Sequence, residues 1–304
     1  MKNYSKYLKP KSCVIFLFHG VIKKNPFKIR NYNNKHLTID KFEKVLDDIK
    51  DKNGVCLSLD EVYLKIKGKN RFEDYSYAIT FDDGFFNNYS CALPILVKKR
   101  LKATFYITTN FIEKNELSWI DKIEYMVERT NLIKKVNVLN KKFCIKNNKK
   151  SKINFLKKIR SLAKSNPAID VFKLVFDIKS QLNYRGALTN MNNILDKKLN
   201  WSQVKKINSH KNFCIGGHTT THRILAFLNA DSMKKEITNS IKIIYKNTGT
   251  KISHYSYPEG LPHTYSDREI KFLKKSGIKM CPSAEHGINN EKSNLYSLKR
   301  ILVN

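Results

Sequence analysis

Two short stretches of the sequence carry side chains whose types and spacing suit hydrolytic chemistry. In "YAITFDDGFF" (77–86) an apolar, strand-like run leads to two adjacent carboxylates, Asp82 and Asp83, and then to Gly84. Because successive side chains of a strand point to opposite faces, both acids can serve one site only if the strand ends there. Gly84 permits such an ending, since glycine accepts the positive φ of a sharp turn. The alternative is an Asx turn with two solvated aspartates.

The second stretch is "GGHTTTHR" (216–223), in which His218 and His222 stand four residues apart. On a single helical turn this spacing places both imidazoles on one face, close enough to bind one cation. Two imidazoles and one carboxylate suit Zn²⁺ or a similar divalent ion and leave positions for water and substrate. A chance surface pair of histidines is the alternative.

The elements that must position these residues alternate between strand-like and helix-like stretches, the pattern of βα units around a mostly parallel sheet. The expected strands are 13–20, 77–84, 103–109, 213–219, 254–260, 279–286 and 298–304, and the clearest expected helices are 38–50, 232–249 and 266–277. Several of the strands have polar residues at their carboxyl ends, where barrels and open α/β sheets build their sites. We therefore expect the two stretches to meet at that edge.

The segment of about 126–198 interrupts this alternation. It contains a hairpin-like run (136–145) and lysine-rich helical stretches, and none of its spacings is typical of catalysis. We expect one domain over residues 1–304 that carries this segment as an insertion or subdomain.

The net charge of +32 is compatible with nucleic acid, an anionic membrane surface or an acidic glycan as a partner. Lysine far outnumbers arginine along the whole chain, however, which favours a solvated lysine face over a dedicated anion-binding surface. The chain shows no motif for binding RNA or DNA, so we expect no specific nucleic-acid partner.

The six cysteines are scattered without C-x-x-C pairs, which favours a reducing compartment. The apolar run at 13–18 is too short to span a bilayer, and no small-residue cleavage site follows it. We expect a cytoplasmic protein whose lysines allow a peripheral contact with an anionic membrane.

Three motifs, "TFDDG" (80–84), "HTTTH" (218–222) and "YSYPEG" (255–260), resemble in their types and order those of the NodB-like polysaccharide deacetylases, carbohydrate esterase family four. "FLFHGV" (16–21) is similar to the Tyr-His-x-Val opening of many bacterial members. The resemblance implies a distorted (β/α)7 barrel, here with the lysine-rich helical and hairpin segment inserted. It also implies a metal-dependent hydrolase that removes N-acetyl groups from a GlcNAc-type sugar or a glycan precursor in surface polysaccharide biosynthesis.

Carried over by motif, Asp83, His218 and His222 would hold one divalent metal ion, with Zn²⁺ as first choice and Co, Ni, Mn or Fe as alternatives. Asp82 would be the general base that removes a proton from the attacking water. Tyr257 would lie beside the site, where backbone amides of the family stabilise the oxyanion.

The chain departs from the family pattern at two places. Ser256 stands where many members have an arginine that orients the catalytic aspartate, and "LKR" (298–300) stands where many have Leu-x-His, whose histidine is the general acid. Because a guanidinium can hold a carboxylate with two parallel hydrogen bonds, we predict that Arg300 orients Asp82 instead.

The general acid is left open by the sequence. His19 and His286 are the candidates, and Trp119 and Asp121 either line the cleft or anchor the insertion. Two other classes of function stay open as well: a catalytically silent sugar-binding module and a basic nucleic-acid-binding protein.

Overall fold

A six-stranded parallel sheet forms the centre of the molecule, in the strand order β8-β5-β4-β1-β10-β9. The computed structural model describes residues 3–68, 71–131, 133–189 and 192–304. The strands of the sheet are β1 (Cys13–Phe18), β4 (Ser76–Phe81), β5 (Ala103–Ile107), β8 (Phe213–Gly217), β9 (Pro282–His286) and β10 (Leu298–Leu302). Six of the seven expected strands are therefore present, and β1 and β4 are buried along their whole length.

The one expected strand that is not formed, 254–260, is reduced to two isolated parallel bridges. Tyr255 pairs with Gly217 at the end of β8, and His254 pairs with Met280 before β9, so this segment lies between the two edges of the sheet. Pro258 cannot donate to a ladder, and Glu259 and Gly260 have φ values of 64° and 58°, which turns the chain away. The result is a (β/α)7 barrel that is distorted at this segment.

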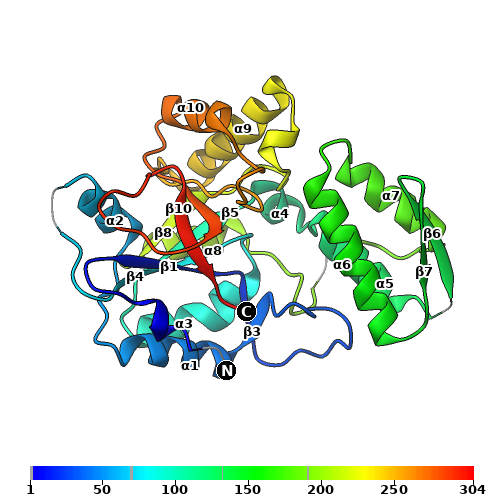
Figure 1. Cartoon of the computed structure of the whole chain (residues 1–304), viewed down its shortest axis with the longest axis horizontal. Coiled ribbons are helices and arrows are strands. Elements are labelled where there is room, and N and C mark those ends of the chain that lie inside the picture. Colours follow the sequence, from blue (N-terminus) through cyan, green and yellow to red (C-terminus); the bar gives the residue numbers. More distant parts are fainter. Residues whose placement is uncertain (1–2, 69–70, 132, 190–191) are drawn as a thin grey trace.

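Helices connect and cover the strands, as Figure 1 shows. They are α1 (Ile39–Lys50), α2 (Leu59–Ile66), α3 (Leu93–Lys98), α4 (Thr109–Lys114), α5 (Trp119–Arg129), α6 (Lys149–Ser165), α7 (Val171–Gln181), α8 (Trp201–Asn208), α9 (Ala230–Thr248) and α10 (Asp267–Lys275). Short elements complete the chain: η1 (Ser5–Tyr7), η2 (Asn88–Ala92), η3 (Leu225–Phe227), and the parallel pair β2 (Gly20–Ile22) and β3 (His36–Thr38). None of the described helices is long and apolar enough to cross a membrane.

The ends of the predicted helices follow from their capping residues. α9 ends at Gly249, whose φ of 72° is the left-handed conformation that glycine adopts without strain. α10 begins with a capping box in which Ser266 and Glu269 bond each other's backbone N–H groups.

Residues 119–188 form a separate lobe, which we call the insertion lobe. Figure 1 shows α5, α6, α7 and the hairpin of β6 (Lys134–Val138) and β7 (Lys141–Ile145) side by side, to the right of the sheet. The lobe has its own apolar cluster, which includes Ile123, Leu156 and Ile159. Helix α5, which begins at Trp119 and so precedes most of the segment of about 126–198, packs in the same cluster.

We expect Ile159→Ala, in the core of the insertion lobe, to lower the free energy of unfolding by about 2–5 kcal/mol, because it leaves a cavity at a fully buried position. Amide hydrogen exchange should quicken across the lobe and stay slow in β1 and β4, since the two apolar clusters are separate. Ile237→Ala, a matched change on α9 in the barrel cluster, is the control and should quicken exchange in the barrel. If each variant lost protection equally in the lobe and in the barrel, the lobe and the barrel would not be two separate cooperative units.

Candidate active site

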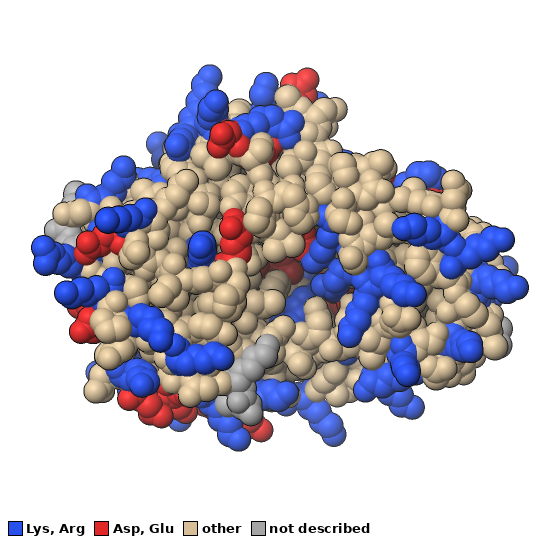
Figure 2. All heavy atoms as spheres, in the orientation of Figure 1, with Lys and Arg blue, Asp and Glu red and all other residues tan. Residues whose placement is uncertain are grey.

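A cavity of about 240 Å³ opens at the carboxyl ends of β1, β4 and β8. The space-filling view shows a hollow near the centre of the molecular face, beside the insertion lobe (Figure 2). The charged and imidazole side chains that line the cavity are His19, Lys35, Asp82, Asp83, Arg160, Lys164, His218, His222, Glu259 and Arg300. The two predicted stretches therefore meet at one site, as the sequence indicated.

Asp82 and Asp83 both face the cavity because the backbone turns directly after β4. The Asp82 N–H still bonds the Phe18 carbonyl at 3.0 Å, which continues the ladder between β4 and β1. Asp83 then has a φ of 77° and Gly84 a φ of 70°, so two left-handed residues in succession end the strand. A positive φ is costly for an aspartate, and such conformations persist where the surrounding structure enforces them.

The two histidines do not share a helical turn, and that part of the sequence interpretation was wrong. Residues 218–222 form an irregular loop after β8, in which Thr219 and His222 have φ values of 65° and 60°. The Thr219 hydroxyl accepts the His222 N–H at 2.9 Å and closes the loop. The ring centroids of His218 and His222 lie 4.8 Å apart, so a tight turn achieves the convergence that a helix was expected to provide.

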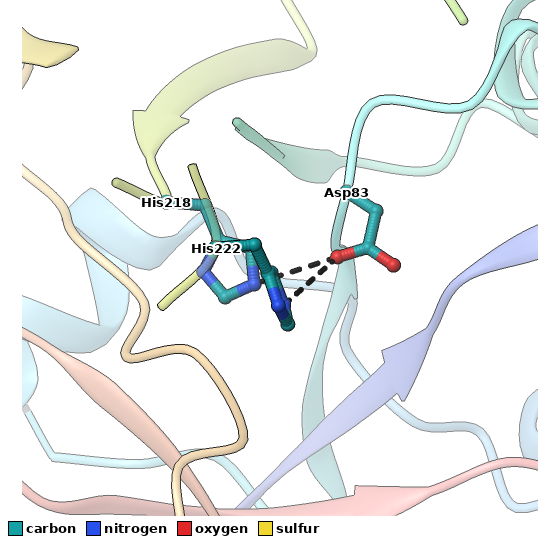
Figure 3. Close-up of side chains that lie close together, drawn as sticks. All are labelled: Asp83, His218 and His222. Atoms are coloured by element: carbon teal, nitrogen blue, oxygen red, sulfur yellow. Dashed lines mark ion pairs between the residues drawn. The ribbon is translucent and has the colours of Figure 1, made fainter. Parts of the chain in front are cut away.

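Asp83, His218 and His222 point toward one another (Figure 3). Oδ1 of Asp83 lies 3.6 Å from Nε2 of His218 and 3.3 Å from Nε2 of His222. Among the described residues this buried oxygen has no hydrogen-bond donor. Burial opposes ionisation of Asp83, but His222, His19 and His218 together outweigh it, and the pKa of Asp83 lies well below its ordinary value.

The tautomer of His218 suits metal binding. Nδ1 of His218 donates to the Ser256 carbonyl at 2.8 Å, which leaves the Nε2 lone pair directed at Asp83. A buried anionic oxygen without another donor among the described residues, together with one buried and one partly exposed imidazole, is a donor set that fits Zn²⁺ or a similar divalent ion.

Asp82 is held by Arg300. Nη1 and Nη2 of Arg300 donate to Oδ1 and Oδ2 of Asp82, each at 2.9 Å. Nη2 also donates to the Ser256 hydroxyl at 2.9 Å, and Nε donates to the Ser283 carbonyl at 2.5 Å. Burial raises the pKa of Asp82 and Arg300 lowers it, with a net decrease. The serine at the position of the missing arginine therefore makes room for a guanidinium that arrives from β10.

The structure separates the remaining candidates. His19 and Trp119 line the cavity, and Asp121 lies one step behind it, bonded to Lys35 at 2.5 Å. Tyr257 also lines it, but its hydroxyl donates to the Tyr296 carbonyl at 3.0 Å and so is not free to act as a donor in the cavity.

His286 does not lie at the site, contrary to the sequence expectation. It is exposed at the end of β9, and its ring packs edge-on against Tyr7 at 5.3 Å. In the register of β9 and β10 it stands opposite Arg300, but only Arg300 is buried in the barrel.

The insertion lobe contributes to the cavity, which the sequence reasoning missed. Arg160 and Lys164 stand four residues apart on α6 and both line it. Lys164 pairs with Glu259 of the third motif, and its carbonyl accepts a hydrogen bond from His263 at 2.9 Å. The spacing of these two cations was a signal for one shared face, but it was hidden among the many lysines around it.

A parallel barrel with an Asp-His-His cluster and a clamped aspartate at its strand ends is typical of metallohydrolases. The model of the polysaccharide deacetylase family matches residues 69–281, and the chain therefore belongs to this family of N-deacetylating hydrolases. Deacetylases of this family use a divalent metal ion. No curated protein sequence matches the chain.

Solved structures show the same fold at low sequence identity. The Streptococcus pyogenes deacetylase PplD in complex with acetate has a TM-score of 0.61 and 18% identity, with 97% of this chain and 93% of that chain covered. IcaB from Ammonifex degensii has a TM-score of 0.63 and 13% identity over 98% and 94% of the two chains. A de-N-acetylase from Aggregatibacter actinomycetemcomitans has a TM-score of 0.59 and 15% identity over 96% and 94%.

We expect Arg300→Lys to lower kcat by roughly tenfold or more while divalent metal content stays intact, because lysine keeps the charge and loses the two-pronged contact. The pKa of Asp82 should rise, so the acidic limb of the pH profile of kcat should move to higher pH. Steady-state kinetics and elemental analysis of the purified variant test this. An unchanged kcat with an unchanged acidic limb would show that Arg300 does not position the base.

Reversal of the charges at Lys164 and Glu259 tests whether their ion pair fixes the cavity wall. Lys164→Glu and Glu259→Lys should each lower kcat/KM, and the double variant should recover part of the loss, with a coupling free energy of about 0.5–3 kcal/mol. Simple additivity of the two losses would mean that the lobe and the third motif are not coupled through this pair.

Proposed function

We propose that this chain is a metal-dependent deacetylase that hydrolyses the N-acetyl group of a GlcNAc-type sugar or glycan precursor in surface polysaccharide biosynthesis. The observation that carries the proposal is the buried Asp83 oxygen, which faces two imidazole nitrogens and has no hydrogen-bond donor among the described residues. Asp83, His218 and His222 would hold the metal, with Zn²⁺ as first choice and Co, Ni, Mn or Fe as alternatives. When bound, the ion polarises the amide carbonyl and makes a water molecule more acidic.

Asp82 takes the proton of the attacking water in this proposal. Its carboxylate stays ionised at neutral pH because Arg300 lowers its pKa against the effect of burial. Both of its oxygens are fixed by the Arg300 guanidinium, so the carboxylate has one orientation when the water approaches. Near Tyr257, the backbone N–H groups would stabilise the negative oxygen that forms, since the Tyr257 hydroxyl is engaged elsewhere.

His19 is the proton donor that we assign to the departing amine. It follows β1, lines the cavity, and has a buried Nδ1 without a partner among the described residues. Burial lowers the pKa of His19 to about 4, so the ring is neutral before the reaction. It therefore has to take up the proton released from water, by way of Asp82, before it delivers that proton to the leaving nitrogen. A ring of low pKa gives up such a proton readily.

Substitution of His19 should affect amide and ester substrates differently. An amine leaves only when protonated, whereas 4-nitrophenolate leaves without a proton. We expect His19→Gln to lower kcat on an N-acetylated sugar by about 100-fold or more and to change hydrolysis of 4-nitrophenyl acetate far less. Equal losses on both substrates, with metal content unchanged, would show that His19 has another role.

Metal analysis together with an acetate-release assay tests the proposed function directly. The purified protein should carry about one divalent ion, consistent with one three-residue donor set. It should release acetate from chitooligosaccharides or from carrier-linked N-acetyl sugars, and His218→Ala should lose both metal and activity. A protein that never binds a divalent ion would refute the proposal. Tight glycan binding without acetate release under any metal would identify a silent sugar-binding module.

The cytoplasmic location stays a prediction. All six cysteines are free, including the exposed Cys144, which supports a reducing compartment. Fractionation of cells that express the native protein tests this.

A further inference from the structure

A second pocket, of about 170 Å³, adjoins the catalytic cavity, and we call it the side pocket. Trp119 and His222 line both spaces, so the two lie next to each other. One wall of the side pocket is the connection between α6 and α7 in the insertion lobe, and the other is the segment that follows His222. The side pocket therefore lies beside the catalytic cavity, between the lobe and the barrel.

Nine of the twelve residues that line the side pocket are apolar, including Ile169, Val171, Ile224 and Phe227. Of the other three, His222 belongs to the metal cluster, and the Asp170 carboxylate accepts hydrogen bonds from the first N–H groups of α7. A sugar ring placed here would bury hydroxyl groups without partners, which is unfavourable. A hydrocarbon chain fits this lining better.

Arg223 is the third polar residue of the side pocket. It shows no hydrogen bond or ion pair with any residue that the structure describes. Its guanidinium lies 5.7 Å from the centre of the Phe172 ring, and it directly follows the metal-cluster residue His222. An unpaired guanidinium in the wall of the side pocket is suited to an anionic group such as a phosphate.

Two exposed aromatic side chains lie on the outside of the insertion lobe, one of them in contact with a residue of the side pocket. Phe172, which packs on Arg223, is 43% exposed, and Phe176 is 70% exposed. The two stand four residues apart on α7 and so lie on the same face of the helix. Lys173 and Lys179 belong to the same helix, and exposed aromatic rings with nearby lysines are typical of surfaces that meet an anionic membrane.

We propose that the side pocket binds the hydrocarbon chain of a lipid-linked sugar whose phosphate lies on Arg223, while the N-acetyl group occupies the catalytic cavity. The inference rests on the proposed deacetylase function and narrows its substrate to an N-acetylated sugar carried on a phospholipid-like anchor. The part of the hydrocarbon chain that extends beyond the side pocket passes over Phe172 and Phe176 toward the membrane.

Kinetics on matched substrates test the inference. The probes are N-acetylglucosaminyl phosphate with a methyl group and the same compound with a decyl chain. We expect kcat/KM to be at least about tenfold higher for the decyl compound, because each buried methylene contributes roughly a factor of four. Equal kcat/KM values for the two compounds would overturn the assignment. A kcat/KM that rises instead with the length of soluble chitooligosaccharides would also overturn it, because the side pocket would then be a sugar subsite.

Variants of the side pocket separate the contact with the chain from the contact with the phosphate. Ile224→Asn should lower the decyl-to-methyl ratio of kcat/KM by about fivefold or more, because it places an amide against the chain. Arg223→Gln should lower kcat/KM on both compounds by about fivefold or more and leave the ratio near its wild-type value, because both compounds carry the phosphate. Arg223→Lys, which keeps the charge, should retain most of kcat/KM on both. Tyr245→Ser, at a half-exposed aromatic on α9, is the matched control and should leave both values unchanged. A wild-type ratio in Ile224→Asn, or wild-type kcat/KM values in Arg223→Gln, would contradict the proposal.

A binding measurement separates this inference from the proposed function. The chain has two tryptophans, and Trp119 lines both pockets, so a Trp201→Phe protein reports on Trp119 alone. Titration with decyl phosphate should give a saturable change in fluorescence that Arg223→Gln weakens by about fivefold or more, as expected for loss of a charge-assisted contact. No saturable change would refute the lipid site even in an active deacetylase. Binding without acetate release from any substrate would refute only the proposed function.

Discussion

A single buried guanidinium connects most of the parts of this site. Arg300 on β10 binds the Asp82 carboxylate directly after β4. It also binds the Ser256 hydroxyl in the distorted segment 254–260 and the Ser283 carbonyl on β9. A charge at 1% exposure is tolerated only when it is paired and its hydrogen bonds are satisfied. The position of β10 between β1 and β9 is therefore a condition for the site, because it brings the guanidinium within reach of the carboxylate.

Left-handed residues at the strand ends give the site its shape, and other contacts hold them in place. Asp83, Thr219 and His222 all have φ values between 60° and 77°. The loop that contains the two histidines is fixed from outside: the Tyr255 hydroxyl accepts the Thr219 N–H at 2.8 Å, and the Glu236 carboxylate on α9 accepts the next two N–H groups. Left-handed residues also occur elsewhere in the chain, but these three carry or fix the side chains of the Asp-His-His cluster, which is consistent with a preorganised site.

The sequence was sufficient for features that depend on local patterns. Periodicity predicted the strands that lead to Asp82 and His218, and capping chemistry predicted the start of α10. The closure of a seven-stranded barrel predicted the contact of Arg300 with Asp82. It was insufficient where tertiary contacts decide. The four-residue spacing of the histidines suggested a helix, but the capping of their loop by α9 cannot be read locally. Likewise, Arg160 and Lys164 reach the cavity only because the insertion lobe packs beside the barrel.

The charge of +32 says little about the site itself, because the cavity is locally balanced. Its four lining cations are each paired with an acid: Lys35 with Asp121, Arg160 with Glu124, Lys164 with Glu259, and Arg300 with Asp82. The excess lysines therefore lie outside it, and the cavity does not attract anions merely because the chain is basic. Arg223 differs from these four, since it lines the side pocket and has no acidic partner among the described residues. A single unpaired guanidinium, partly shielded from solvent in the wall of a pocket, is a more specific feature for recognition than a surface of solvated lysines, because its planar donors can hold a bound anion in one orientation.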